Sequence, residues 1–537
     1  MFTLALLIGI YSYFLFALGL AGLFYRNYIV GTTIFYIFTI FYFYKKTFTD
    51  KIFQCFSEFK KRFEFRHFTF ESIRQNITLI MLSLMLMLQV LVNLVGVLGP
   101  ELAFDALWYH LALPKIYLQN HSISYIPGGL LYYSAMPKLT EMLYAAGLAF
   151  GSETIPKFIH FSFGILSLIA LYKLSRKFLS RVFSLLAVVL FYSNLVVGWM
   201  SITAYIDLAR TFFEIMALWG FIEWFEKKKK KWFILSAVML GFAISTKLLA
   251  LGSFLIFSIL IVYIAFSKKE EIKTVFNRLL SYWIIALFIV FSWLVFAFIN
   301  TGNPIHPFFT NIYPAKFNFG LINPLNLPDP ISPLYVISLP LAVFLYGKLK
   351  LPLKVISLYS FIAIVVWQIT PHTGGGRFIL PYLPAFSIVS VAIIEKIGQV
   401  KLRFLFVGAI IAFALFSIFY RGVANSKYIP VILGKESKSQ FLSSHLNFSF
   451  GDFYDTDNYF EDNIKTDDKV LLYGFHNLYY VDFPFIDSSY VKKGNAFNYI
   501  AVQEGELPER FRFWDLIYYN DKTNVRLYSI GGLRWVY

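Results

Sequence analysis

The residues best suited to chemistry lie between Glu101 and Glu141, in a stretch that opens with Glu101-Leu102-Ala103-Phe104-Asp105-Ala106-Leu107-Trp108-Tyr109-His110. The stretch contains acids, a histidine and prolines, yet it lies between segments that are apolar enough to cross a bilayer. A charge beside a membrane is energetically unfavourable, so such residues commonly take part in catalysis or bind ions. The alternative is an ordinary polar loop, because loops routinely carry charges.

Two aspartates are the candidate catalytic residues. Asp105 lies a few residues beyond an apolar segment, where its carboxylate could take a proton from an acceptor hydroxyl group. Asp207 lies at the start of a later apolar segment, in Ala204-Tyr205-Ile206-Asp207-Leu208-Ala209-Arg210. If both acids face the same compartment, they could share one substrate or a divalent metal ion such as magnesium, manganese or zinc. Asp207 could instead form a structural ion pair with Arg210, three residues further along a helix.

Basic side chains at the ends of other apolar segments could bind a phosphate group. Lys247 could hold a lipid-linked phosphate, or its side chain could simply extend to the headgroup layer. Arg377 follows three glycines, Gly374 to Gly376, whose backbone N–H groups can approach an anion closely. Its planar guanidinium group matches the geometry of phosphate oxygens. His372 precedes this glycine run and is the third candidate for binding such a phosphate.

The composition is that of a polytopic membrane protein. Of the 537 residues, 58% are hydrophobic and 15% are charged, and the mean hydropathy is +0.63. Soluble globular domains do not carry this much apolar surface. The single cysteine, Cys55, excludes a disulfide framework and a cysteine-based metal cluster.

Apolar runs of about 17 to 25 residues recur as far as about Tyr420 and predict about thirteen transmembrane helices. The predicted spans lie near residues 3–24, 28–45, 75–98, 155–173, 181–197, 205–225, 232–246, 248–266, 281–299, 332–347, 354–370, 377–395 and 404–420. One alternating set of connections holds about 27 of the 48 Lys and Arg residues, which assigns that set to the cytoplasm. The formal charge of +17 therefore mostly reflects the basic residues of the cytoplasmic connections and does not indicate binding of nucleic acid. The candidate site residues all fall in the opposite set, outside the cytoplasm.

The chain divides into three predicted parts. Residues 1–74 are an N-terminal transmembrane hairpin with a basic cytoplasmic segment, and residues 75–420 are a transmembrane catalytic domain with external loops. Residues 421–537 carry 15 of the 31 acids and no apolar span, so they are predicted to form an extracytoplasmic domain. Within it, Val470–Tyr473 and Tyr499–Val502 predict strands. Residues 439–445 and 459–464 predict short helices, which together give a small α/β domain.

Several segments resemble the membrane glycosyltransferases of the GT-C superfamily. Within this superfamily, the segments are most similar to the branch of the protein O-mannosyltransferases and the lipid A aminoarabinose transferase. This branch resembles the bacterial members of glycosyltransferase family 39. The stretch from Phe104 to Tyr117 resembles their first external loop, and Met136 to Leu143 resembles its second amphipathic helix. Thr203 to Ala209 is similar to their second external loop. Further landmarks of bacterial members are Ser245-Thr246-Lys247, Thr301-Gly302-Asn303-Pro304 and Arg377-Phe378-Ile379-Leu380-Pro381. The resemblance covers roughly residues 75–400.

The resemblance implies the GT-C fold and a sugar donor linked to polyprenyl phosphate. It implies that Asp105 is the catalytic base and that Asp207 brings a second acid to the site. The candidates for binding the acceptor or another part of the substrate are Tyr109, His110, Glu141 and His306. Ala106 departs from the family pattern, because many relatives have a second acid there, and this counts against a metal ion shared by Asp105 and Asp207.

We therefore expect an all-α membrane glycosyltransferase that moves a sugar to an extracytoplasmic lipid, glycan or protein. The alternative is a transporter or flippase for a lipid-linked or small anionic substrate. A transporter would place ionisable residues near mid-membrane and contain inverted repeats, and neither is evident in the sequence. A purely structural membrane protein would leave the one-sided cluster of acids and cations unexplained.

Overall fold

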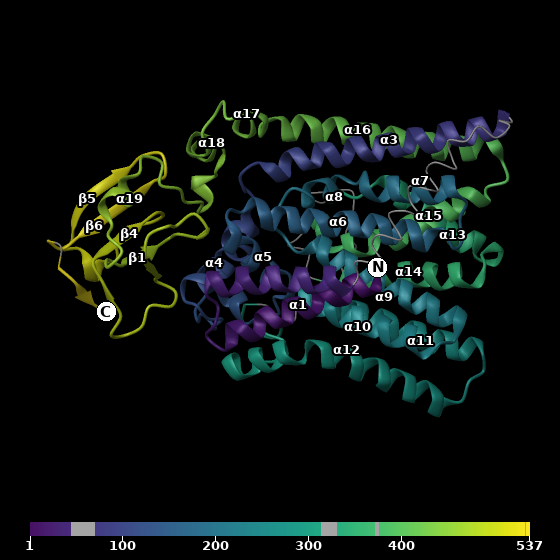
Figure 1. Ribbon diagram of the computed structural model, residues 1–537, viewed down its shortest axis with the longest axis horizontal. Helices are drawn as coiled ribbons and strands as arrows, with labels where there is room; N and C mark the ends of the chain where they lie inside the picture. The colour runs from purple at the N-terminus through teal and green to yellow at the C-terminus, as the bar shows by residue number, and fades with distance from the viewer. Residues whose placement is uncertain (44–69, 313–329, 371–374, 532) are drawn as a thin grey trace.

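A bundle of long helices carries a small sheet domain at one end of the molecule (Figure 1). The computed structural model describes residues 1–43, 70–312, 330–370, 375–531 and 533–537. The helices of the bundle are α1 (Phe2–Leu20), a helix over residues 26–43, α3 (Phe70–Leu98), α6 (Thr154–Ser175), α7 (Arg181–Tyr192), α8 (Leu195–Met200), α9 (Asp207–Lys227), α10 (Lys230–Thr246), α11 (Leu251–Ser267), α12 (Ile272–Thr301), α13 (Pro333–Leu345), α14 (Leu351–Ile369), α15 (Leu383–Lys396) and α16 (Val400–Ser426).

Each predicted span overlaps one of these helices. Within the described residues, seven helices are long and apolar enough to cross a membrane, and these include α1, α6, α12 and α16. The helices α7 and α13 are apolar but shorter. The helical bundle is that of an integral membrane protein, whereas the number of thirteen crossings stays a prediction.

The helix α9 is the centre of the bundle, because its residues are buried on all sides for most of its length. It packs against α6 and α10, and α10 packs in turn against α12. Small residues allow the close approach: a Cβ atom at Gly220 of α9 would lie 3.0 Å from the backbone nitrogen of Ser236 on α10. Such small-residue contacts are typical of helices in membranes. The start of α9 and the end of α10 are thereby held side by side.

The connection from α3 to α6 lies on the membrane face that carries the sheet domain (Figure 1). Its elements are the π-helical turn η1 (Ala106–His110), α4 (Ala112–Gln119), the 3-10 turn η2 (Tyr132–Ala135) and α5 (Leu139–Phe150). In η1, the N–H of Leu111 donates to the carbonyl of Ala106 at 2.9 Å. Single π-helical turns are found frequently at functional sites.

The C-terminal domain contains a five-stranded mixed sheet with the strand order β2-β1-β4-β6-β5. Parallel pairing joins β1 to β2 and β4, and antiparallel pairing joins β6 to β4 and β5. The strands are β1 (Val470–Tyr473), β2 (Phe485–Asp487), β3 (Ala496–Phe497), β4 (Tyr499–Val502), β5 (Asp515–Asn520), β6 (Val525–Ser529) and β7 (Trp535–Val536). The helices and helical turns are α17 (Ile429–Ile432), α18 (Lys438–His445), η7 (Phe448–Phe450), α19 (Tyr459–Asn463) and η8 (Glu509–Phe511). The strands predicted at 470–473 and 499–502 are confirmed, and α18 and α19 lie where short helices were predicted.

Two lysine side chains help to fasten this domain to the loop that follows α3. The Lys115 ammonium group donates to the carbonyls of Tyr479 and Val481 at 2.7 and 2.8 Å and pairs with Asp482 at 2.5 Å. Lys438 pairs with Glu153 at 2.8 Å. Because Glu153 is buried beside the start of α6, this second pair joins the domain to the helical bundle.

Candidate active site

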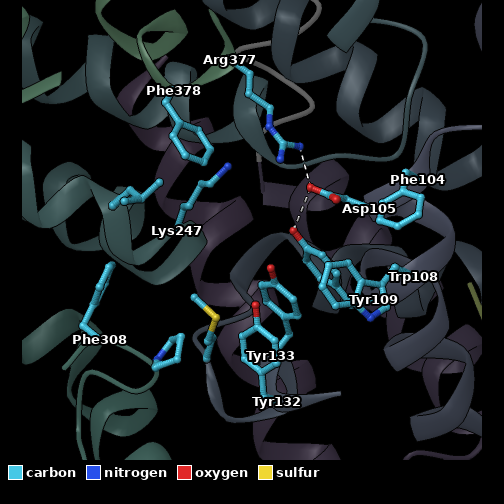
Figure 2. Close-up of a pocket in the computed structure, with 13 residues that line it drawn as sticks. Phe104, Asp105, Trp108, Tyr109, Tyr132, Tyr133, Lys247, Phe308, Arg377 and Phe378 are labelled. Carbon is cyan, nitrogen blue, oxygen red and sulfur yellow. Dashed lines mark hydrogen bonds and ion pairs between the residues drawn. The ribbon is translucent and has the colours of Figure 1, made fainter. Parts of the chain in front are cut away.

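A cavity of about 390 Å³ lies at the membrane face that carries the C-terminal domain. It is formed by η1 and η2 of the loop after α3, by the segments that follow α10 and α12, and by the segment that precedes α15 (Figure 2). The lining residues are Phe104, Asp105, Trp108, Tyr109, Tyr132, Tyr133, Met136, Lys247, Leu249, Pro307, Phe308, Arg377 and Phe378. Four of the predicted site residues are in this lining: Asp105, Tyr109, Lys247 and Arg377.

Asp105 is held by three neighbours at the start of η1. Its Oδ2 atom accepts hydrogen bonds from Arg377 Nη1 at 2.6 Å and from the Tyr109 hydroxyl at 3.2 Å (Figure 2). Its backbone N–H donates to the hydroxyl of Tyr205 at 3.1 Å. The π-helical turn brings Tyr109 back over the carboxylate, so the side chain of Asp105 is fixed from both its own loop and the distant glycine-rich segment.

Lys247 and Asp207 form the second ion pair of the site, at 2.7 Å. Asp207 is the first residue of α9, and Lys247 follows the last residue of α10 in an extended backbone conformation. The Asp207 side chain is only 1% exposed, and Lys247 reaches it from the cavity. The alternative pairing with Arg210 is wrong, because Arg210 instead contacts Glu214 at 3.4 Å and the hydroxyl of Tyr382 at 2.9 Å.

The two cations lie close to each other and to both acids. Burial alone would lower the pKa of Arg377, but the charges of Asp105 and Asp207 outweigh it and raise this pKa above its usual value. For Lys247, burial dominates and lowers the pKa, although Asp207 partly opposes the shift and Arg377 adds to it. The Phe378 ring lies under the Lys247 ammonium group at 4.9 Å. Both basic groups therefore border a cavity lined with aromatic side chains, in which a further anion would be stabilised.

The other predicted residues lie behind the cavity wall or outside the described residues. His110 Nδ1 and Glu141 Oε1 are 2.9 Å apart and both side chains are buried, so this pair links η1 to α5. His306 is buried beside Pro307, with its ring 6.4 Å from that of Tyr132, and does not line the cavity itself. Burial lowers its pKa, and the nearby charge of Lys138 adds to the shift. His372 falls outside the described residues.

An aromatic wall completes the cavity, and of its residues only Tyr109 was predicted as a site residue. Tyr109 and Tyr133 stack with ring centroids 3.7 Å apart, and Tyr132 stacks on Tyr133 at 4.2 Å. Trp108 continues the wall and donates its indole N–H to the carbonyl of Leu130 at 2.9 Å. Aromatic faces of this kind suit the apolar faces of a sugar ring or an isoprenoid chain. The sequence gives no usable signal for them, since aromatic residues make up 20% of the whole chain.

The C-terminal domain reaches the site through His476. The imidazole ring stacks on Phe104 at 4.6 Å and packs against Trp108 at 4.2 Å. Three residues further on, the N–H of Tyr479 donates to the carbonyl of Leu107 at 3.1 Å. The segment that carries Asp105 is therefore supported from outside the membrane domain.

In the part of the chain that the structure describes, the surroundings of Asp105 and Asp207 do not suit a divalent metal ion. Each carboxylate is occupied by a cation, Arg377 or Lys247. Over the described ranges, no group of three or more His, Cys, Asp or Glu side chains could hold a metal ion. Divalent metals in proteins normally take several oxygen or nitrogen ligands, so no catalytic step is derived through a metal.

Known proteins share this architecture. Residues 145–296 match the family model described as dolichyl-phosphate-mannose-protein mannosyltransferase. The fold is similar to that of ArnT from Cupriavidus metallidurans bound to undecaprenyl phosphate, with a TM-score of 0.57, 10% sequence identity, and coverage of 83% of this chain and 97% of that chain. The apo state of ArnT gives a TM-score of 0.55 at 10% identity, with the same coverage of both chains. No curated protein matches the sequence at a significant level.

Proposed function

We propose that this integral membrane protein, which has the ArnT-like fold of the GT-C superfamily, transfers a sugar from a polyprenyl-phosphate carrier to an extracytoplasmic acceptor. The observation that carries the proposal is the cavity at the membrane face, which is lined by Asp105, by its partner Arg377 and by Lys247. A carboxylate and two cations in one space are the groups that a transfer from a lipid phosphate requires. The acceptor is a lipid, a glycan or a protein.

The similarities to known proteins support a sugar donor that is linked to a lipid phosphate. ArnT, whose fold this chain shares, is described with undecaprenyl phosphate bound. The matched family is described by a dolichyl-phosphate donor, and residues 145–296 contain both Asp207 and Lys247. A lipid-linked donor also fits a cavity that lies at the end of membrane helices, since such a donor reaches the site from within the bilayer.

In the proposed reaction, Asp105 is the general base. The acceptor hydroxyl gives its proton to the Asp105 carboxylate while its oxygen forms a bond to the anomeric carbon of the sugar. The bond between that carbon and the carrier phosphate breaks, and the phosphate leaves with the electron pair. Lys247 and Arg377 stabilise the negative charge that develops on the phosphate. A guanidinium group has five N–H donors, so Arg377 can keep its contact with Asp105 and still bind a phosphate oxygen.

The remaining candidates have supporting roles in this proposal. Asp207 orients Lys247 through their ion pair. Tyr109 orients Asp105 and offers its ring to the substrate, whereas the buried pair of His110 and Glu141 holds η1 against α5. His372 and His306 stay candidates for the donor phosphate and for the acceptor, respectively.

The experiment that tests the proposal measures release of polyprenyl phosphate. Purified protein in detergent is given polyprenyl-phosphate-linked sugars, with a cell-envelope extract as the source of acceptor, and the freed carrier is followed by mass spectrometry. We expect turnover without any sealed compartment, and a loss of about 100-fold or more for Asp105→Asn, the range for removal of a general base. The matched control is Asp467→Asn, which changes an exposed acid of the C-terminal domain.

Two results would overturn the proposal. The first is undiminished turnover in Asp105→Asn. The second is an absence of carrier release together with substrate movement across sealed vesicles, which is the behaviour of a transporter or flippase. Circular dichroism and size-exclusion profiles of the variants establish that each has folded.

A further inference from the structure

A second cavity, of about 350 Å³, lies at the opposite ends of the helices that carry Asp207 and Lys247. It is formed by the end of α9, the start of α10 and the first turns of α12. Since α9 has 21 residues, its two ends are separated by about 30 Å at 1.5 Å per residue. The two cavities therefore lie at opposite membrane faces, and the second one is unrelated to the proposed catalysis.

The side chains that form this cavity change from polar to apolar with depth. On α12, Thr274, Arg278, Ser281 and Ile285 succeed one another at helical spacing along one face. On α10, the same order is seen from Lys230 at the first turn to Phe233 and Ile234 at the second. A ligand that fills this cavity must have a polar, anionic end at the membrane surface and an apolar body directed into the membrane.

The cations around the cavity exceed the acids. Arg278 pairs with Glu270, and elsewhere on this face Lys177 and Lys227 pair with Glu223. By contrast, over the described ranges, Lys228, Lys230 and Lys268 form no ion pair with an acid.

Lys228 is held in this position by the backbone. It has a φ angle of +57° at the end of α9, and its N–H donates to the carbonyl of Trp224 at 2.8 Å. The turn folds its ammonium group over the rings of Phe225 and Trp224, at 4.7 and 5.4 Å. Burial, and then the neighbouring Lys268, lower the pKa of Lys228 to about 8. An anion bound beside Lys228 would offset the repulsion that this lysine experiences.

We propose that this cavity binds the headgroup of an anionic phospholipid, with the phosphodiester between Lys228 and Lys230 and the acyl chains along Phe233, Ile234 and Ile285. Basic cavities between membrane helices are suited to such headgroups. Trp224 also lines the cavity, and tryptophan is enriched where membrane proteins meet the headgroup layer. The change from polar to apolar side chains with depth favours a phospholipid over a soluble anion. A soluble anion would have no apolar part to contact the deeper side chains.

The test measures lipid retention by native mass spectrometry and the thermal midpoint of the protein in neutral detergent. Phosphatidylglycerol is titrated, with phosphatidylcholine and inorganic phosphate as comparison probes. The double variant Lys228→Gln, Lys230→Gln should bind phosphatidylglycerol about 30-fold more weakly, because each lysine near an anionic lipid contributes about 1 kcal/mol and 1.4 kcal/mol is a factor of ten. The control Lys348→Gln, Lys350→Gln removes the same charge from exposed positions beside η4 (Tyr346–Lys348) and should bind like the unchanged protein.

A second variant keeps the net charge. Asn277→Trp, at an exposed position of the lining, should fill the cavity and weaken phosphatidylglycerol binding as the lysine variant does. Equal retention of phosphatidylcholine, equal stabilisation by inorganic phosphate, or equal losses in the lysine variant and its control would each overturn the proposal. Both variants lie far from the proposed catalytic residues, so failure here leaves the proposed transferase activity untouched.

Discussion

The carboxylate of Asp105 lies 2.6 Å from Arg377, although 272 positions separate the two residues in the chain. The pair joins the first loop of the membrane domain to the glycine-rich segment before α15. In the absence of a donor, the guanidinium group neutralises the proposed base. In the proposed transfer, this cation would be shared by the carboxylate and the donor phosphate, so we expect the contact to couple donor binding to the position of the base.

The Lys247 and Asp207 pair predicts a specific pattern of stability. Lys247→Met leaves the buried Asp207 carboxylate without its cation, which should destabilise the protein by about 3–5 kcal/mol. The double variant Lys247→Met, Asp207→Asn removes both charges and should recover most of this loss. Donor binding should stay weak in both variants, because the cation that binds phosphate is absent. Thermal unfolding and lipid-donor binding check the two parts, and recovery of donor binding in the double variant would contradict the role of Lys247.

The two cations should act on one phosphate. Substitution of Lys247 or Arg377 by Met should weaken donor binding by about 1.5–3 kcal/mol, the range for hydrogen bonds to charged groups. Because contacts to a shared group are coupled, the double variant should lose less than the sum of the two single losses. Isothermal titration with polyprenyl phosphate measures the three affinities. Strict additivity would mean that the cations bind different groups.

The four charged groups of the site were predictable from the sequence, but their partners were not. Asp105, Asp207, Lys247 and Arg377 stand out because each interrupts or ends an apolar run. The choice of Lys247 over Arg210 as the partner of Asp207 depends on how closely α10 packs against α9, which spacing along one helix does not reveal.

Other features depend on tertiary contacts that no local pattern encodes. The π-helical turn at Ala106–His110 and the stacking of His476 on Phe104 belong to this class. Each predicted span overlaps a helix and both predicted strands are present, because hydrophobic periodicity reflects the burial of a local segment. The strands β2, β3, β5, β6 and β7 were not predicted. The aromatic wall was missed because Tyr132 and Tyr133 do not stand out in a sequence that is so rich in aromatic residues.

The docking of the C-terminal domain should weaken in acid. Burial would raise the pKa of Glu153, but the charge and hydrogen bond of Lys438 outweigh this effect and lower the pKa below its ordinary value. The stabilisation is therefore complete above the unfolded pKa of about 4.3 and is lost as the pH falls through the lower folded value. The difference in thermal midpoint between the unchanged protein and Glu153→Gln should be constant near neutral pH and shrink below about pH 4.3. An identical pH dependence of the two proteins would rule out this contribution.

Removal of metal ions should leave the proposed transfer intact. The carboxylates of Asp105 and Asp207 are each paired with a cation, and those cations can stabilise the leaving phosphate without a metal ion. We expect carrier release to continue at an undiminished rate after dialysis against EDTA. A loss of activity that magnesium, manganese or zinc restores would mean that at least one of the aspartates exchanges its basic partner for a metal ion.

The orientation in the membrane follows from the distribution of basic residues. We predict that the loop from Gly99 to Glu153 and residues 421–537 face the extracytoplasmic side of the plasma (inner) membrane, whereas Lys227 to Lys231 face the cytoplasm. The natural Cys55 is first replaced by Ser, and single cysteines are then introduced at the exposed positions Ser152, Lys435 and Lys229. A thiol reagent that does not cross membranes should label the first two positions in intact cells and the third only after the cells are opened. Labelling of Lys229→Cys in intact cells, without labelling at the other two positions, would invert the topology and place the proposed transfer in the cytoplasm.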